Sequence, residues 1–532
     1  MPGSLDRAHR AADSDAEFKS WSVGGLLDTA VREAPDRPAL IRPAGADGSP
    51  ERRWSYRELQ ADAARAARAL LTRFGAGDRV ATWAGASPEI LILQLGAALA
   101  GIVLVTLNPA NRAAELSYLL AQSEARGIVL DRVFRKLDNV AVLDGLRAAL
   151  PHLQHVVYLD EFEQFLAGGR PGALVPVRAD AAAMILFTSG TTGKPKGVVL
   201  RHDGIVNNAR FSTERLALGS GAVWLNVLPL FHIGGSVTMT LGCISNLGTQ
   251  ILLCEFSAAA MIEALQRYEV NVTMAVPTMF HAMFDNEHFA AADFSALQLV
   301  VTGGTAIAPE LVREVRRRFQ AEVMVMFGQT EAGGCMCLTR RGDAEERITS
   351  SVGMPLPLAE AKVILPESGA VAHLGQVGEI CVRSPCAMLE YFRMPDQTAE
   401  TLDPDGWVHT GDLGVMRADG YLQVTGRLKD MIIRGGENIY PREVEDMLAE
   451  HPAVAQSAVF GVPDPKWGEQ VAAAVILKSG AATDGETLTR YLQERIARHK
   501  VPKQWHFVDS FPVNASGKIQ KFVLRERHQV PL

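Results

Sequence analysis

The segment Leu186-Phe-Thr-Ser-Gly-Thr-Thr-Gly-Lys-Pro-Lys-Gly197 joins an apolar run to a dense group of glycines, hydroxyl side chains and lysines. Glycine allows close backbone approach to a polyphosphate, hydroxyl and N–H groups donate to its oxygens, and lysine offsets its charge. The segment is not a Walker A loop, because proline follows Lys194 where serine or threonine is required. A flexible surface loop can also be rich in glycine and threonine, but so dense a string favours phosphate binding. The candidate phosphate-binding residues are Thr188, Ser189, Gly190, Thr191, Thr192, Gly193, Lys194 and Lys196.

On both sides of this loop, short aliphatic or β-branched runs alternate with stretches of helical period. Strands are predicted over residues 127–130, 183–187, 272–276 and 297–302, and helices over 258–268 and 309–319. The last of these helices begins at Ala308-Pro309, and proline is favourable in a first helical turn. The alternation predicts an α/β fold with largely parallel, buried strands.

The pattern changes after about residue 375, where short strands are expected over 378–383 and 421–424. A polar junction over 426–430 precedes roughly 100 residues, the size of one small domain. Those residues contain two predicted helices, over 441–450 and 485–499. We therefore predict two parts, a large α/β body over residues 1–426 and a compact α+β lid over residues 427–532.

Length and composition limit the class of protein. A chain of 532 residues exceeds one compact core, and 48% hydrophobic with 21% charged residues is typical of soluble globular proteins. The net charge of −7 gives no basic footprint for nucleic acid. Six cysteines are too few for a disulfide framework, and the first residues lack the apolar core of a secretory signal. The chain is therefore predicted to be cytoplasmic.

Residues 90–107 are apolar enough to imitate a membrane span. The stretch contains Gly96 and Gly101 and changes from Ala/Leu-rich to β-branched at Ile102. A buried helix followed by a buried strand explains that change better than one membrane helix. No membrane span is predicted.

Three further segments carry chemistry. Phe327-Gly-Gln-Thr-Glu331 places an aromatic ring, a hydroxyl and a carboxylate after an apolar run. Trp407-Val-His-Thr-Gly-Asp412 ends in a carboxylate suited to hydrogen-bonding a ribose diol, and Asn514-Ala-Ser-Gly-Lys518 presents a lysine in a short turn. Taken singly, Asp412 or Lys518 would be an ordinary solvated turn residue. Their occurrence together in this order indicates a nucleotide site.

In this order the segments resemble those of the adenylate-forming superfamily, which includes acyl-CoA synthetases (AMP-dependent carboxylate–CoA ligases), luciferases and nonribosomal-peptide adenylation domains. The resemblance extends from Trp54-Ser-Tyr-Arg-Glu-Leu59 to Gly517-Lys518, with further blocks at Gly353-Met-Pro355, Gly378-Glu-Ile380 and Gly435-Gly-Glu-Asn-Ile-Tyr-Pro441. It implies a large N-terminal domain, built of two α/β subdomains and a β-barrel, and a small mobile α+β C-terminal domain that carries a catalytic lysine.

The resemblance also implies a reaction, in which a carboxylate attacks the α-phosphorus of ATP to give an acyl-adenylate and pyrophosphate. Positive charge and Mg²⁺ would stabilise the charge that spreads over the phosphoryl oxygens. The loop from Thr188 to Lys196 would then surround the β- and γ-phosphates, and Glu331 and Thr191 would hold Mg²⁺. The remaining expected contacts are Thr330 near the α-phosphate; Gly303, Gly304, Thr305, Phe327 and Gly328 around adenine; Asp412 and Arg427 at the ribose; and Lys518 between the carboxylate and the α-phosphate.

In the second half-reaction of such enzymes, the thiol of coenzyme A attacks the acyl-adenylate and AMP leaves. The C-terminal domain rotates about a hinge, here Lys429. Rotation removes Lys518 and brings Arg434, Gly435 and Gly436 to the pantetheine tunnel. One cavity cannot hold both the lysine and the incoming thiol, which is the physical reason for two arrangements.

By family position the acyl pocket should include residues 231–235, Met239, Gly303 and residues 332–336. This lining is small and apolar, which favours a fatty, alicyclic or aryl acid over an amino acid. His232 is a candidate gate for the carboxylate end, and a packed, hydrogen-bonded histidine is the alternative. Phe327 departs from the family, where tyrosine is commoner, so ring stacking survives without a phenol hydrogen bond.

The leading hypothesis is thus an ATP-dependent acyl-CoA ligase whose partners are a small carboxylic acid, ATP and coenzyme A. One alternative is an acyl-AMP ligase that delivers its acyl group to a carrier-protein phosphopantetheine. Another is an inactive acyl- or nucleotide-binding homologue, which the intact Lys518, Glu331, Asp412 and Arg427 argue against. A homodimer and a carrier-protein partner are left open.

Overall fold

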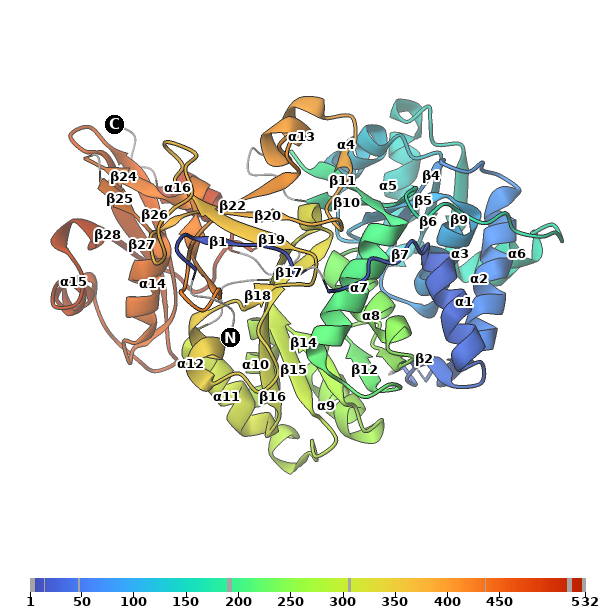
Figure 1. Cartoon of the computed structure of the whole chain (residues 1–532), viewed down its shortest axis with the longest axis horizontal. Helices are drawn as coiled ribbons and strands as arrows, with labels where there is room; N and C mark the ends of the chain where they lie inside the picture. Colours follow the sequence, from blue (N-terminus) through green and yellow to red (C-terminus); the bar gives the residue numbers. More distant parts are fainter. Residues whose placement is uncertain are drawn as a thin grey trace.

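The computed structural model describes residues 5–13, 15–45, 48–188, 194–304, 308–435, 437–513 and 519–528. Two large α/β sheets lie side by side in one half of the molecule, and a small separate sheet lies at the C-terminal end (Figure 1). An antiparallel sheet stands between this C-terminal sheet and the two large sheets. The mixed α/β fold predicted from the sequence is confirmed.

The first large sheet has seven strands. Its parallel part, β10-β5-β4-β6-β9, is extended by the antiparallel strands β11 and β21. The strand bounds, in sheet order, are β21 (Glu390–Tyr391), β11 (Lys196–Arg201), β10 (Ala182–Thr188), β5 (Val103–Leu107), β4 (Arg79–Trp83), β6 (Gly127–Leu130) and β9 (His155–Tyr158). Strands β4, β5 and β6 are almost entirely buried, which explains their continuous apolar sequence.

The second large sheet has nine strands, of which β16-β15-β14-β12-β13-β2 run parallel. In sheet order the strands are β18 (Met354–Pro355), β17 (Gly334–Leu338), β16 (Glu322–Gln329), β15 (Leu299–Gly303), β14 (Val272–Ala275), β12 (Val223–Asn226), β13 (Thr249–Leu252), β2 (Pro38–Arg42) and β3 (Arg52–Ser55). A small hairpin, β7 (Val133–Phe134) and β8 (Leu137–Asp138), stands apart from it.

The part expected as a β-barrel is a five-stranded antiparallel sheet with the order β1 (His9–Arg10), β19 (Glu360–Ile364), β20 (Gly378–Arg383), β22 (Trp407–Met416) and β23 (Leu422–Arg427). The C-terminal sheet consists of β25 (Glu437–Ile439), β24 (Ile432–Arg434), β27 (Gly468–Leu477) and β26 (Val454–Asp464), with β28 (Gln504–Phe507) beside β27. The change of sheet thus falls between β23 and β24, next to the predicted junction over 426–430.

Helices cover the sheets (Figure 1). They are α1 (Val23–Glu33), α2 (Tyr56–Leu71), α3 (Pro88–Ala100), α4 (Ala113–Ser123), α5 (Asn139–Leu146), α6 (Phe162–Ala167), α7 (His202–Leu216), α8 (Thr240–Ser245), α9 (Ala258–Arg267), α10 (Pro277–Phe284), α11 (Pro309–Phe319), α12 (Glu345–Ser350), α13 (Pro395–Thr401), α14 (Pro441–Ala449), α15 (Gly485–Gln493) and α16 (Lys521–His528).

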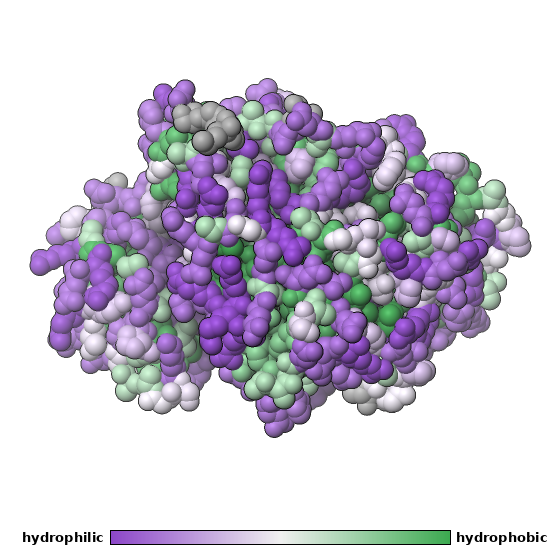
Figure 2. All heavy atoms as spheres, turned by 60° about the horizontal axis from the view of Figure 1, so that its bottom comes forward, coloured by the Kyte–Doolittle hydropathy of each residue, from purple (hydrophilic) through white to green (hydrophobic). Residues whose placement is uncertain are grey.

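The apolar stretch over 90–107 is resolved as predicted into helix α3 followed by strand β5. Helix α3 contacts both α1 and α2, and its residues are buried on nearly every side, as expected of a helix that is apolar all round. Within the part of the chain that the structure describes, no helix combines the length and apolarity that crossing a bilayer requires. The face in Figure 2 is mainly hydrophilic, with hydrophobic side chains in small separate areas.

The prediction of one helix over 485–499 is wrong in its length. Helix α15 ends at Gln493, and a separate 3₁₀ turn covers Arg498–Lys500. The N–H groups of Arg495 and Ile496 both donate to the Leu492 carbonyl, so the chain closes a turn there and leaves the helix towards strand β28.

Candidate active site

The candidate phosphate loop connects two adjacent strands. Thr188 ends β10, Lys196 begins β11, and the two residues are register partners in the antiparallel pair. Of the predicted loop, Ser189, Gly190, Thr191, Thr192 and Gly193 lie outside the described residues. The described part already places a hydroxyl and an ammonium group where the hairpin opens.

Glu331 lies opposite the base of this hairpin, in the 3₁₀ turn Thr330–Ala332 that follows β16. The hydroxyl of Thr188 donates to Glu331 Oε1 at 3.1 Å, and the hydroxyl of Tyr391 donates to the same oxygen at 2.8 Å. Lys196 Nζ lies 4.7 Å from the centroid of the Tyr391 ring. Burial, together with the nearby Glu331 charge, raises the pKa of Tyr391, so the phenol stays a donor. The structure thus brings Thr188, at one end of the predicted phosphate loop, into contact with the predicted metal carboxylate.

A second carboxylate site surrounds Asp412, on β22. Asp412 is 6% exposed, and Arg427 Nε donates to its Oδ1 at 3.2 Å from the end of β23. Gln329 Nε2 donates to Asp412 Oδ2 at 2.9 Å and to the Thr410 carbonyl at 2.7 Å. Because Gln329 precedes Thr330 and Glu331, the two carboxylate sites are joined by one short segment. Thr330 is buried.

The predicted adenine-contacting residues lie on neighbouring strands. Gly303 ends β15 and pairs in register with Met326, the residue before Phe327 on β16. A Cβ atom on Gly303 would lie 2.3 Å from the Met326 carbonyl oxygen, so this position excludes any side chain. Gly304 is exposed and Gly328 half-buried, whereas Thr305 lies outside the described residues.

Of the residues predicted for the hinge and the thiol tunnel, Arg434 belongs to the C-terminal sheet. Lys429 is exposed in the 3₁₀ turn Leu428–Asp430, just after β23. Arg434 ends β24, lies with its guanidinium carbon 5.2 Å from the Trp467 ring centroid, and donates to the His499 carbonyl at 3.3 Å. Gly435 follows it. Gly436 and Lys518 lie outside the described residues, and the structure does not test their predicted roles.

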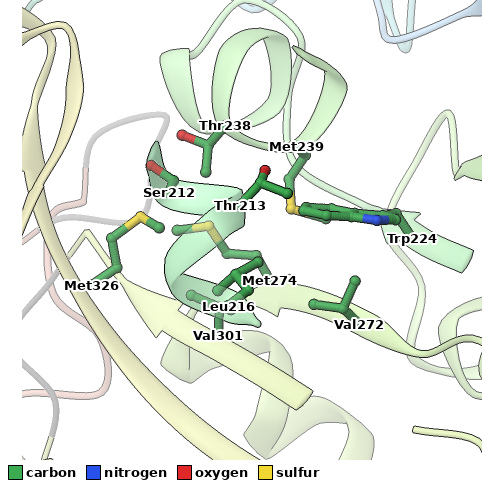
Figure 3. Close-up of a pocket in the computed structure, with 10 residues that line it drawn as sticks. All are labelled: Ser212, Thr213, Leu216, Trp224, Thr238, Met239, Val272, Met274, Val301 and Met326. Carbon is green, nitrogen blue, oxygen red and sulfur yellow. The ribbon is translucent and has the colours of Figure 1, made fainter. Parts of the chain in front are cut away.

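A small apolar cavity lies between helix α7 and the nine-stranded sheet, and Figure 3 shows the side chains around it. It encloses about 10 Å³, room for about one water molecule. In Figure 3, Met274 and Met326 point toward each other and Met239 reaches the Trp224 ring. The lining residues are Ser212, Thr213, Leu216, Trp224, Thr238, Met239, Val272, Met274, Val301 and Met326.

Of the predicted acyl-pocket residues, Met239 lines this cavity. It lies in a π-helical segment over Gly234–Met239, an irregularity that is frequent at functional sites. His232 precedes that segment, is exposed, and accepts a hydrogen bond from the Gly234 N–H on its Nδ1 at 3.2 Å. Its predicted gating role stays a prediction.

Sequence reasoning missed two residues at these sites. Gln329 lies inside the Phe327–Glu331 motif. Its side-chain amide, between an aromatic and an acidic residue, could have been predicted to form hydrogen bonds at the site. Tyr391 gave no such signal, because a lone tyrosine before Phe392 resembles an ordinary strand residue. Its contact with Glu331 spans 60 positions of sequence.

Two family models match the chain. The AMP-binding enzyme model matches residues 27–392, and the AMP-binding enzyme C-terminal domain model matches residues 443–518. The chain belongs to the AMP-binding enzyme family. The membership confirms the resemblance to adenylate-forming enzymes that the motifs predicted.

Named relatives cover almost the whole chain. The Bacillus subtilis (strain 168) protein YngI, itself provisionally named an acyl-CoA synthetase, is 35% identical over 96% of this chain and 98% of YngI. The mitochondrial medium-chain acyl-CoA ligase ACSF2 of Rattus norvegicus is 34% identical over 97% of this chain and 88% of ACSF2. ATP-bound MatB from Rhodopseudomonas palustris is 30% identical, with a TM-score of 0.87 over 96% of this chain and 99% of MatB; apo MatB gives 0.78.

These relationships confirm the predicted reaction class. The chain is an AMP-forming acid–thiol ligase, and its substrates include a small carboxylic acid, ATP and coenzyme A.

Proposed function

We propose that this ligase activates a straight, medium-chain fatty acid as its acyl-adenylate and transfers the acyl group to coenzyme A. The observation that carries this proposal is the apolar cavity between α7 and the nine-stranded sheet. Its lining holds no charged side chain, so a second carboxylate or an ammonium group on the acid would be buried there without a partner.

The methionines of the lining favour a flexible aliphatic chain over a rigid ring. A cavity of about 10 Å³ does not hold an acyl tail as it stands. Met239, Met274 and Met326 are unbranched, and methionine side chains adapt their shape to a variable apolar neighbour. Displacing them would open a narrow channel beside Trp224, which would suit a chain of limited length. The name of the relative ACSF2, a medium-chain acyl-CoA ligase, supports the same substrate class.

For the first half-reaction we assign the ATP phosphates to the hairpin between β10 and β11, with Thr188 as a hydroxyl donor and Lys194 and Lys196 as charge partners. Thr330 lies towards the α-phosphate, and Phe327 with Gly303 and Gly304 takes adenine. Asp412 accepts hydrogen bonds from the ribose hydroxyls beside Arg427. Lys518 orients the acid carboxylate against the α-phosphorus.

The residues around Glu331 fit a magnesium ion, which takes oxygen ligands. Glu331 offers a carboxylate, and Thr188 already donates to it at 3.1 Å. We propose that Glu331, with Thr191, holds Mg²⁺, which when bound neutralises phosphate charge. Tyr391 orients the carboxylate by its 2.8 Å hydrogen bond.

For the second half-reaction we propose that residues 427–532 form a mobile domain that rotates at Lys429 and brings Arg434, Gly435 and Gly436 to the thiol. The higher TM-score to ATP-bound than to apo MatB supports the adenylate-forming arrangement for this structure. A cytoplasmic location is supported by six free cysteines. The homodimer and the carrier-protein acceptor stay predictions.

The direct test is mass-spectrometric detection of acyl-CoA after incubation with ATP, magnesium, coenzyme A and single acids. The panel runs from butanoate to hexadecanoate and includes cyclohexanecarboxylate, benzoate and phenylacetate. The highest kcat/KM is expected for octanoate or decanoate. A clear preference for an aryl acid would contradict the substrate class, and acyl-adenylate without thioester would point to a carrier protein as acceptor.

The cavity residue Met274 gives a prediction about chain length. Met274→Ala should lengthen the channel, so the preferred acid should become longer and kcat/KM for octanoate should fall. Each methylene gained or lost in an apolar pocket changes kcat/KM roughly fourfold. Met283→Ala is the control, because Met283 is also buried but lies in a different core cluster. An unchanged chain-length profile in Met274→Ala would place the acyl tail elsewhere.

The thiol tunnel gives a second prediction. Gly436→Trp should block thioester formation while pyrophosphate release from ATP and acid continues. Acyl-CoA and pyrophosphate measured in one reaction separate the two steps. Gly172→Trp is the control, since a Cβ on this exposed loop glycine meets nothing within 4 Å. Normal thioester formation in Gly436→Trp would show that the tunnel lies elsewhere.

A further inference from the structure

The turn that carries Asp412 is a bulge held by a carboxylate from the neighbouring strand. Strands β20 and β22 pair Glu379 with Leu413 and Cys381 with His409, so residues 410–412 face Ile380 alone. Such a bulge interrupts the hydrogen-bond ladder. The Gly411 N–H donates instead to Glu379 Oε1 at 3.0 Å, with Gly411 in the left-handed region at φ +67°.

His409, at the start of the bulge, fixes the other oxygen of the same carboxylate. Its Nδ1 lies 3.1 Å from Glu379 Oε2, and its Nε2 lies 3.6 Å from Asp403 Oδ2. Glu379 is 8% exposed. Contacts with the Cys381 sulfur and with Glu379 raise the pKa of His409 to about 10. The ring is therefore a cation between two carboxylates at neutral pH.

A metal ion is the alternative occupant, because donor atoms of Glu379, Cys381 and His409 lie within 4.8 Å of one another. Metal binding requires a thiolate and a neutral imidazole. Burial raises the pKa of Cys381, and His409 holds its proton to about pH 10. Lys362 on β19, the register partner of Cys381, is a further cation near this cluster. A protonated histidine explains the arrangement without a metal.

We propose that His409 is a positioning residue for ATP, which with Glu379 fixes the bulge so that the Asp412 carboxylate meets both ribose hydroxyls. The inference rests on the proposed ribose contact of Asp412. Groups that are held in place before a ligand binds lose less freedom on binding. Weakening the contact between His409 and Glu379 should therefore weaken the ribose contact of Asp412. His409 itself touches no substrate in this assignment.

The first test compares His409→Gln with His409→Arg. His409→Gln keeps a polar side chain but removes the charge. The KM for ATP should rise roughly tenfold, as expected for loss of a charge-assisted hydrogen bond. The kcat should stay within about twofold of the wild-type value. His409→Arg keeps the charge and should restore most of the affinity. His288→Gln, on an exposed histidine, is the control. A His409→Arg variant as weak as His409→Gln would overturn the role of the charge.

The second test repeats the KM measurement with 2′,3′-dideoxy-ATP in place of ATP. Wild type should bind the analogue more weakly than ATP, and His409→Gln should add almost no further loss. An equal loss for both nucleotides would show a general structural defect and overturn the proposal. If the wild-type protein bound ATP and 2′,3′-dideoxy-ATP equally well, Asp412 would not contact the ribose hydroxyls. That result would contradict the proposed function rather than the role of His409.

A pH profile and a metal assay complete the test. In wild type, the KM for ATP should be flat near neutral pH and rise as pH passes about 10, where His409 loses its proton. In His409→Arg that rise should be absent. Stoichiometric zinc in the purified wild-type protein would overturn the proposal in favour of a metal site.

Discussion

Lys518→Ala is expected to lower acyl-adenylate formation by about 10³-fold, while thioester formation from supplied acyl-adenylate stays near the wild-type rate. The proposed lysine bridges two anions, the acid carboxylate and the α-phosphate, which repel each other without it. Those anions no longer exist as a pair once the adenylate has formed. Pyrophosphate release measures the first step, and acyl-CoA formed from synthetic acyl-adenylate measures the second.

Lys478→Ala is the control for this prediction, because Lys478 is an exposed lysine of the same C-terminal part. It should change neither step. An equal loss of both steps in Lys518→Ala would contradict the assigned role and indicate damage to the whole domain. The described residues next to Lys518 are Val513 and Ile519, which form an antiparallel bridge, so circular dichroism and thermal unfolding should accompany the kinetics.

Glu331→Gln is expected to lower kcat/KM for adenylate formation by about 10²–10³-fold. The substitution keeps the size and one acceptor oxygen, so the hydrogen bonds from Thr188 and Tyr391 can persist. It removes the negative charge through which Glu331 would attract magnesium. The variant should therefore require a higher magnesium concentration for half-maximal rate, and that dependence is the measurement that separates metal binding from simple loss of structure.

Glu390→Gln is the matched control, since Glu390 is exposed on β21 directly beside Tyr391. It should retain the wild-type magnesium dependence. Tyr391→Phe is the companion variant, because it removes the 2.8 Å hydrogen bond to Glu331 but leaves the charge. Its effect should be smaller, roughly tenfold. An unchanged magnesium dependence in Glu331→Gln would assign the metal to other ligands.

The sequence alone determined the reaction class, because the groups that we propose to act on ATP are concentrated in short motifs. Thr188 to Lys196, Phe327 to Glu331 and Trp407 to Asp412 each keep their residues close in the chain, so order and spacing carry the signal. It also determined the α/β architecture, since buried parallel strands must be apolar throughout. Strand β6 and helix α11 begin and end where the pattern predicts.

Only the tertiary structure decided what lies between the motifs. Tyr391 reaches Glu331, Gln329 reaches Asp412, and Glu379 holds both His409 and the Gly411 N–H, over separations of 30 to 83 residues. Contacts of this kind depend on strand pairing and register, which local periodicity does not encode. The apolar cavity proposed for the acyl chain is likewise formed by α7, a π-helical turn and neighbouring strands, so its size and its methionines became visible only once those elements packed together.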